Sequence, residues 1–146
     1  MPAAAHVAAF MDIGTNSVRL LLVRLNANHT HTVLTSQKEV VRLGEDEFDS
    51  GQLQPEAMRR AALVCRKFAE LARSHGARSI TAVATSATRD ADNQHEFLAR
   101  LKREAGLDVR VVAGKEEARL VYLGVSSGVH LGAHKALFLD IGGGSA

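Results

Sequence analysis

The sequence predicts an α/β domain built on a mixed five-stranded sheet, with three antiparallel strands first and then parallel strands with flanking helices. Two observations support this fold class. Strand-like apolar segments follow one another without a helix over residues 7–43, and strands then alternate with amphipathic helices up to residue 141. Antiparallel neighbours need only short turns, whereas parallel neighbours need long crossovers, so the order of segments predicts the pairing.

The antiparallel part begins with a hairpin over Val7 to Asn26, followed by a third strand from about Thr30 to Leu43. The turn of the hairpin is Asp12-Ile13-Gly14-Thr15-Asn16-Ser17. Gly14 accepts a positive φ at little cost, and Asn16 tolerates the left-handed region better than most residues. We therefore expect a tight turn with outward-facing backbone N–H groups.

The first helix is expected to begin at Pro55 and to end before Gly76, since proline suits the first helical position and glycine the end. Its apolar residues recur at helical spacing, and Cys65 lies on this stripe, which predicts a place in the core. The acidic segment before it, Gly44 to Gly51, lacks the spacing of an EF-hand and is interpreted as a solvated loop.

The remaining elements alternate in type. They are a strand over Ile80–Thr85, a helix from about Asp92 to Ala105, a strand over Val109–Val112, a helix from Lys115 to about Val125, and a last strand over Ala136–Ile141. No linker or low-complexity segment divides them, so residues 1–146 are expected to form a single domain.

Composition restricts the function classes. With 46% hydrophobic and 23% charged residues, the 146-residue chain has the make-up of a soluble globular protein. A net charge of +2 permits an acidic substrate without arguing for a nucleic-acid surface. No apolar run approaches a membrane span, and the scattered histidines are interpreted as non-metal residues. Cys65 is the only cysteine, which fits a reducing cytoplasm, so we expect a cytoplasmic protein without nucleic-acid or membrane partners.

Two stretches near the ends of the chain share one pattern, in which an apolar run is followed by Asp-Ile-Gly and small hydroxylated residues. The first, alone, is also a common hairpin connector, but three consecutive glycines in the second suggest a backbone that a ligand approaches closely. We expect the two loops to face each other across one phosphate, with Asp12 beside it to hold a metal or a water. The predicted phosphate ligands are Gly14, Thr15, Asn16, Ser17, Gly142, Gly143, Gly144 and Ser145.

These paired motifs resemble the two phosphate loops of the actin, Hsp70 and sugar-kinase superfamily. The residues of the two motifs, in their order, resemble those of the exopolyphosphatase and guanosine pentaphosphate phosphohydrolase (Ppx/GppA) family. This resemblance covers nearly the whole chain. It implies a ribonuclease-H-like, actin-like ATPase domain. Three further stretches fit the family: Arg42-Leu43-Gly44-Glu45, Ala84-Thr85-Ser86-Ala87-Thr88-Arg89 with Asn93 following, and Gly114-Lys115-Glu116-Glu117-Ala118-Arg119-Leu120.

The resemblance also implies roles that position alone leaves open. Glu116 and Glu117 open a helix, where acidic residues are favoured whatever the function, but Glu117 matches the catalytic base of the family. By position Arg89 suits a surface ion pair and a phosphate contact equally, and the resemblance favours phosphate. Asp140 matches a metal-associated aspartate, with Mg²⁺ as the expected ion, so Asp140 and Asp12 are the predicted metal residues.

One departure from the family pattern concerns the second loop. Ala146 stands where the family has threonine, and the glutamate that follows in the family is absent from the chain. We therefore expect residues 1–146 to be an N-terminal actin-like subdomain cut just after the second phosphate loop. Such a fragment is expected to be weak or inactive by itself.

Three functions remain open at this point. The first is a phosphoanhydride hydrolase that removes terminal orthophosphate from inorganic polyphosphate, or alternatively from guanosine pentaphosphate. The second is a kinase or ATPase of the same superfamily that binds ATP with the same loops. The third is a non-catalytic phosphate- or nucleotide-binding module, and a homodimer is left open for each. The family motifs favour the first.

Overall fold

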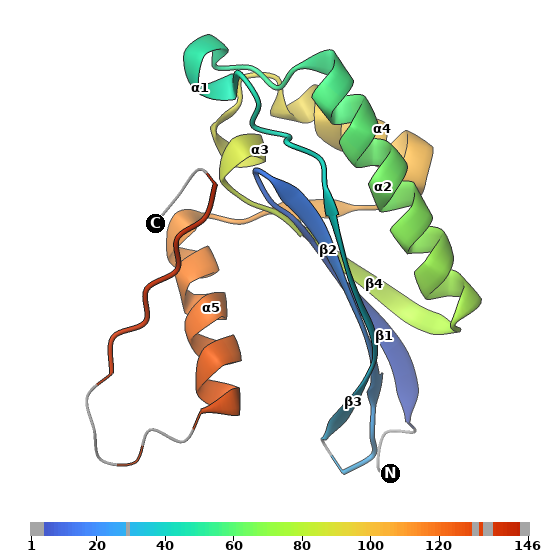
Figure 1. Ribbon diagram of the computed structural model, residues 1–146. Coiled ribbons are helices and arrows are strands. Elements are labelled where there is room, and N and C mark those ends of the chain that lie inside the picture. Colours follow the sequence, from blue (N-terminus) through green and yellow to red (C-terminus); the bar gives the residue numbers. More distant parts are fainter. Residues whose placement is uncertain (1–4, 29, 130–131, 133–135, 144–146) are drawn as a thin grey trace.

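A computed structural model describes residues 5–28, 30–129, 132 and 136–143 of the chain. Within these ranges five strands form one sheet in the order β3-β2-β1-β4-β5, as Figure 1 shows. Pairing is antiparallel for β1 with β2 and for β2 with β3, and parallel for β1 with β4 and for β4 with β5, which confirms the predicted mixed sheet. The strands are β1 (His6–Ile13), β2 (Ser17–Leu25), β3 (His31–Val40), β4 (Ala77–Ala84) and β5 (Val109–Val111).

The three long helices agree with the predicted ones to within a few residues. The structure adds two short helices, one inside the predicted acidic loop and one directly after β4. Single helical turns carry too few residues for a periodic apolar pattern, so no pattern in the sequence indicates them. The helices are α1 (Glu47–Ser50), α2 (Pro55–Ser74), α3 (Ser86–Asp90), α4 (Gln94–Ala105) and α5 (Gly114–Gly128).

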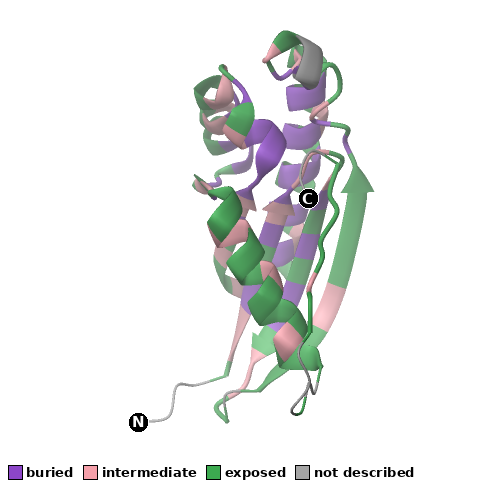
Figure 2. Cartoon of the chain, turned by 90° about the vertical axis from the view of Figure 1, so that its left-hand side faces the viewer, coloured by how far each residue is buried: buried purple, intermediate pink, exposed green. Residues whose placement is uncertain are grey.

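The core lies between the sheet and the layer of α2 and α4 (Figure 1). Along β2, Val18, Leu20 and Leu22 alternate toward this layer and are fully buried, as the period of a strand requires. Cys65 on α2 is also fully buried, which confirms its predicted place in the core. Helix α5 lies on the other side of the sheet and, as Figure 2 shows, is largely exposed. In the described part of the chain, no helix combines the length and the apolar character needed to cross a membrane.

The first hairpin forms as predicted, but its turn does not use the expected backbone conformation. Neither Gly14 nor Asn16 has a positive φ. The Gly14 N–H instead donates to the Ser17 carbonyl oxygen at 3.0 Å, and a Cβ at position 14 would lie 3.2 Å from that oxygen. Glycine therefore suits this position, because a side chain here would lie unusually close to the Ser17 backbone.

The predicted last strand is wrong for this structure. Residues 136–141 do not join the sheet but run beside α5 (Figure 1), where the Phe138 ring packs edge-on against Tyr122 with the ring centroids 5.3 Å apart. Leu137, Leu139 and Ile141 are 92%, 73% and 73% exposed. An alternating apolar run shows that a segment can form a strand, but it does not show which sheet edge is open to that strand.

The thiol of Cys65 tests the packing of α2. Burial raises the pKa of this thiol to about 12. Because the thiolate is the reactive form, iodoacetamide near neutral pH should label Cys65 only as fast as the protein unfolds. Mass spectrometry across a urea series should show labelling that rises at the unfolding transition, with a Cys65→Ser variant as the background. Rapid labelling without urea would contradict the buried position.

Candidate phosphate-binding site

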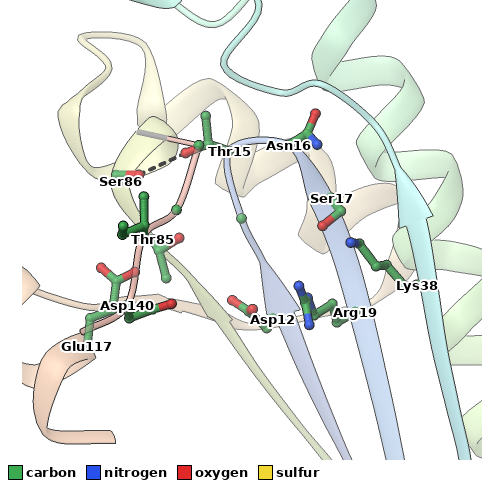
Figure 3. A pocket seen from close by; sticks show the side chains of 14 residues that line it. Asp12, Thr15, Asn16, Ser17, Arg19, Lys38, Thr85, Ser86, Glu117 and Asp140 are labelled. Carbon is green, nitrogen blue, oxygen red and sulfur yellow. Dashed lines mark hydrogen bonds between the residues drawn. The ribbon is translucent and has the colours of Figure 1, made fainter. Parts of the chain in front are cut away.

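A pocket of about 370 Å³ lies at the end of the sheet where β1 and β4 finish and β2 begins. The segment 140–143 and the first turns of α5 close it on one side, as Figure 3 shows. The structure thus brings together most of the residues singled out from the sequence. Those that line the pocket are Asp12, Gly14, Thr15, Asn16, Ser17, Glu117, Asp140, Gly142 and Gly143. Of the remaining predicted phosphate ligands, Gly144 and Ser145 lie outside the described residues, and Arg89 lies beside this pocket rather than in its lining.

The first loop is held by its carbonyl groups. The Asn16 carbonyl oxygen accepts from the N–H groups of Val41 and Arg42, both at 2.9 Å, and the Thr15 carbonyl accepts from the Gly44 N–H at 3.0 Å. In contrast, the N–H groups of Thr15 and Asn16 find no acceptor within the described part of the chain. Two neighbouring backbone donors at the pocket are therefore available to an anion.

The Thr15 side chain is fixed from two directions. Its hydroxyl shares a hydrogen bond of 2.8 Å with the Ser86 hydroxyl at the start of α3 (Figure 3). Its methyl group packs where a side chain at position 44 would be, because a Cβ on Gly44 would lie 2.5 Å from Thr15 Cγ2. Two of the stretches that resemble the family, residues 42–45 and 84–89, therefore serve in part to position the first loop.

The second loop approaches the first closely. A Cβ on Gly143 would lie 3.3 Å from Thr15 Cβ and 3.5 Å from Asn16 Cβ, and the first of these is tighter than most contacts of real side chains. Glycine at position 143 thus lets the two backbones meet at one pocket. The described parts of both loops face a common space, while their role in binding phosphate stays a prediction.

Three carboxylates share the same space. Burial raises the pKa of Asp12, and the negative charges of Glu117 and Asp140 raise it further, while the nearby Arg19 acts in the opposite direction. Such repulsion favours a bound cation. No group of three or more metal-ligating side chains is drawn tightly together among the described residues. An all-oxygen set of this kind fits Mg²⁺, which usually binds through one or two carboxylates together with water and phosphate oxygens.

Arg89 does not line this pocket but lies behind Glu117, beside a second cavity of about 350 Å³ that also borders Asp140. All of its guanidinium nitrogens are engaged. Nη1 donates to Glu117 Oε2 at 3.1 Å and to the Val112 carbonyl at 3.2 Å, while Nε and Nη2 donate to the Asp90 carboxylate at 3.1 and 3.5 Å. Although burial acts against it, the hydrogen bonds with Glu117 and Asp90 raise the pKa of Arg89. In this arrangement Arg89 orients the carboxylate of Glu117.

Five pocket residues were assigned no role in the sequence-based prediction, and one of them is Ile141 of the second Asp-Ile-Gly stretch. Thr85 and Ser86 belong to a quoted motif, whereas Arg19 and Lys38 lie within strands. The pairing explains their place: Asp12 on β1 is opposite Arg19 on β2, and Arg19 is opposite Lys38 on β3. The hairpin register alone points to Arg19. Lys38 requires the register of β3, which a bulge between Leu22 and Val23 shifts.

Comparison with known proteins finds a matching family and curated relatives. A model of the Ppx/GppA phosphatase family matches residues 22–146. Among curated proteins, Exopolyphosphatase 1 of Mycobacterium tuberculosis is 36% identical over 135 residues, which are 92% of this chain and 39% of that protein. Exopolyphosphatase 1 of Mycobacterium leprae is 35% identical over 135 residues, 92% of this chain and 40% of that protein. The chain thus spans about two fifths of these relatives.

Solved structures agree in fold. A crystal structure of an exopolyphosphatase from Cytophaga hutchinsonii matches with a TM-score of 0.80 and 32% identity over 84% of this chain and 39% of that one. The Ppx/GppA family member of Aquifex aeolicus matches with a TM-score of 0.78 and 32% identity, over 83% of this chain and 39% of that one.

The fit of Thr15 against Gly44 gives a direct test of the loop's support. Gly44→Ala places a methyl group against Thr15 and should destabilise the fold by about 1–3 kcal/mol, as overpacked sites do. Gly124→Ala is the matched control, since a Cβ there meets nothing within 4 Å and alanine favours the helix. Urea unfolding of the two variants should shift the midpoint down for the first and not for the second. Equal urea midpoints for the two variants would show that the Thr15 side chain can move aside without a loss of stability, which would contradict the prediction.

Proposed function

Because this chain belongs to the Ppx/GppA phosphatase family, we propose that it supplies the phosphate-binding part of a hydrolase that releases terminal orthophosphate from inorganic polyphosphate. The observation that carries the proposal is a single pocket in which two glycine-containing loops face three carboxylates. The mycobacterial relatives are named exopolyphosphatases. The chain covers only part of their length, so the activity of the whole protein is part of this proposal.

The first step is to hold the terminal phosphate. The N–H groups of Thr15 and Asn16, which have no acceptor among the described residues, donate to its oxygens, and the backbone of Gly142 and Gly143 closes over it from the other loop. Backbone donors of this kind are already oriented before the substrate arrives. They therefore stabilise the charge that spreads over the phosphoryl oxygens as the bond breaks.

The second step is attack by water. Glu117 lines the pocket, and its hydrogen bond from Arg89 fixes one carboxylate oxygen, leaving the other to accept a proton from water. The water oxygen bonds to the terminal phosphorus as the bridging P–O bond breaks on the opposite side. The products are orthophosphate and a polyphosphate shorter by one residue, and the proton taken by Glu117 returns to solvent.

We propose Mg²⁺ as the cofactor, held by Asp140 and Asp12. When bound, the ion neutralises charge on the phosphate oxygens. The two aspartates follow similar apolar stretches in the sequence but have different surroundings: Asp12 lies near the end of β1, while Asp140 lies in the segment that runs beside α5. Arg19, opposite Asp12 on β2, offsets part of the negative charge on that side of the pocket.

Guanosine pentaphosphate is the alternative substrate, since it presents the same terminal phosphoanhydride to the same loops. Polyphosphate is placed first because the matched relatives carry exopolyphosphatase names. We propose the cytoplasm as the setting, consistent with the buried free thiol of Cys65, and a homodimer as the state to be tested by sedimentation.

The role of Glu117 can be measured on the longest protein that the gene encodes. Glu117→Gln keeps the shape of the side chain but cannot accept the proton, so kcat for phosphate release should fall about 10²–10⁴-fold. Phosphate release is followed with Mg²⁺ on polyphosphate and on guanosine pentaphosphate in parallel.

The matched control is Glu116→Gln on the preceding residue of α5, whose carboxylate pairs with Arg119 at 3.8 Å and does not line the pocket. Its kcat should remain close to that of the wild type. If Glu117→Gln released phosphate as fast as Glu116→Gln, the base would have to be another residue. Release from neither substrate by the wild type would contradict the proposed hydrolase.

A further inference from the structure

The charges in the pocket are divided between its two ends. Glu117 and Asp140 lie at the end near α5, and Arg19 and Lys38 lie at the other end, with Asp12 between them (Figure 3). The first loop borders both ends of the pocket, because its last residue, Ser17, is also the first residue of β2. The pocket is therefore acidic where the proposed chemistry occurs and basic where β2 pairs with β3.

The two cations differ in how the protein compensates their charge. Arg19 and Lys38 are directly opposite each other on antiparallel strands, an arrangement in which like charges repel. Arg19 acts on Asp12, its neighbour on the other strand. The Lys38 ammonium makes no ion pair or hydrogen bond with any residue in the described part of the chain. Of the two, Lys38 is thus the cation whose charge the described residues leave uncompensated.

We propose that Lys38 binds an inner phosphate of the substrate. This phosphate is the neighbour of the terminal phosphate that is released, or lies further along the chain. This inference rests on the proposed function. The terminal phosphate lies at the carboxylate end, so the rest of a linear phosphate chain must leave the acidic side. The route toward Arg19 and Lys38 gives each following negative charge a cation.

The chemistry of lysine defines which ligands this subsite takes. An ammonium group on a flexible stem is a point charge with three donors, and it does not demand the planar, paired geometry that arginine does. It therefore suits a flexible chain of phosphates whose inner units vary in position. Orthophosphate, which has no second phosphate, does not reach Lys38, so this residue selects for ligands with two or more linked phosphates.

The test is calorimetric binding of inorganic tripolyphosphate and of orthophosphate, with Mg²⁺, to the longest protein that the gene encodes. All variants carry Glu117→Gln to slow turnover. Lys38→Gln should raise the Kd for tripolyphosphate about tenfold, the loss expected for one charged hydrogen bond, and leave the Kd for orthophosphate within about twofold. Lys38→Arg, which keeps the charge, should restore most of the affinity.

The control is Lys67→Gln, which removes the same charge from an exposed position on α2 outside the pocket. It should leave both dissociation constants unchanged. Equal affinity of the Lys38→Gln and Lys67→Gln proteins for tripolyphosphate would overturn the role of Lys38 while leaving the proposed function intact. Failure of the Glu117→Gln parent to bind either anion would instead contradict the phosphate site itself.

Discussion

The hydrogen bonds to the carbonyls of Thr15 and Asn16 are the constraint on which the site depends. Backbone N–H groups of the segment after β3 donate to these carbonyls, so the hairpin turn is fixed without using the N–H groups of those two residues. Among the described residues, no acceptor occupies these N–H groups, which stay available as a result. Gly44 makes the arrangement sterically possible, because any side chain there would meet Thr15. Within the described residues, the acceptors of this loop are thus satisfied while two of its donors stay free for the anion that we propose it binds.

The same pocket concentrates negative charge, which is unfavourable unless a ligand compensates for it. Asp12 is half-buried and lies in the field of Glu117 and Asp140. A divalent cation together with a phosphate chain would match this charge distribution. The cation would place positive charge against the carboxylates, and the phosphates would place negative charge near Lys38. Arg89 contributes from behind, since its contacts with Asp90 and the Val112 carbonyl fix the group that orients Glu117.

Much of this arrangement could be predicted from local patterns. The hairpin, the third strand, the amphipathic α2 and the buried Cys65 all follow from periodicity, and the Asp-Ile-Gly repeat indicated one shared pocket. What could not be predicted depends on long-range placement. Residues 136–141 have the pattern of a strand yet lie beside α5, Arg89 engages Glu117, and Lys38 enters the pocket only through the register of β3. Periodicity shows which face of a helix or strand is apolar, but it does not show which other element packs against that face.

The central claim is that phosphate binds to the free backbone N–H groups of the first loop. The most direct measurement is a titration of the ¹⁵N-labelled chain with orthophosphate and Mg²⁺, followed by the amide resonances. We expect the Thr15 and Asn16 amide protons to shift downfield together and with one dissociation constant, ahead of amides elsewhere in the sheet. Saturating phosphate that leaves both resonances in place, or that moves only residues outside the pocket, would contradict the account.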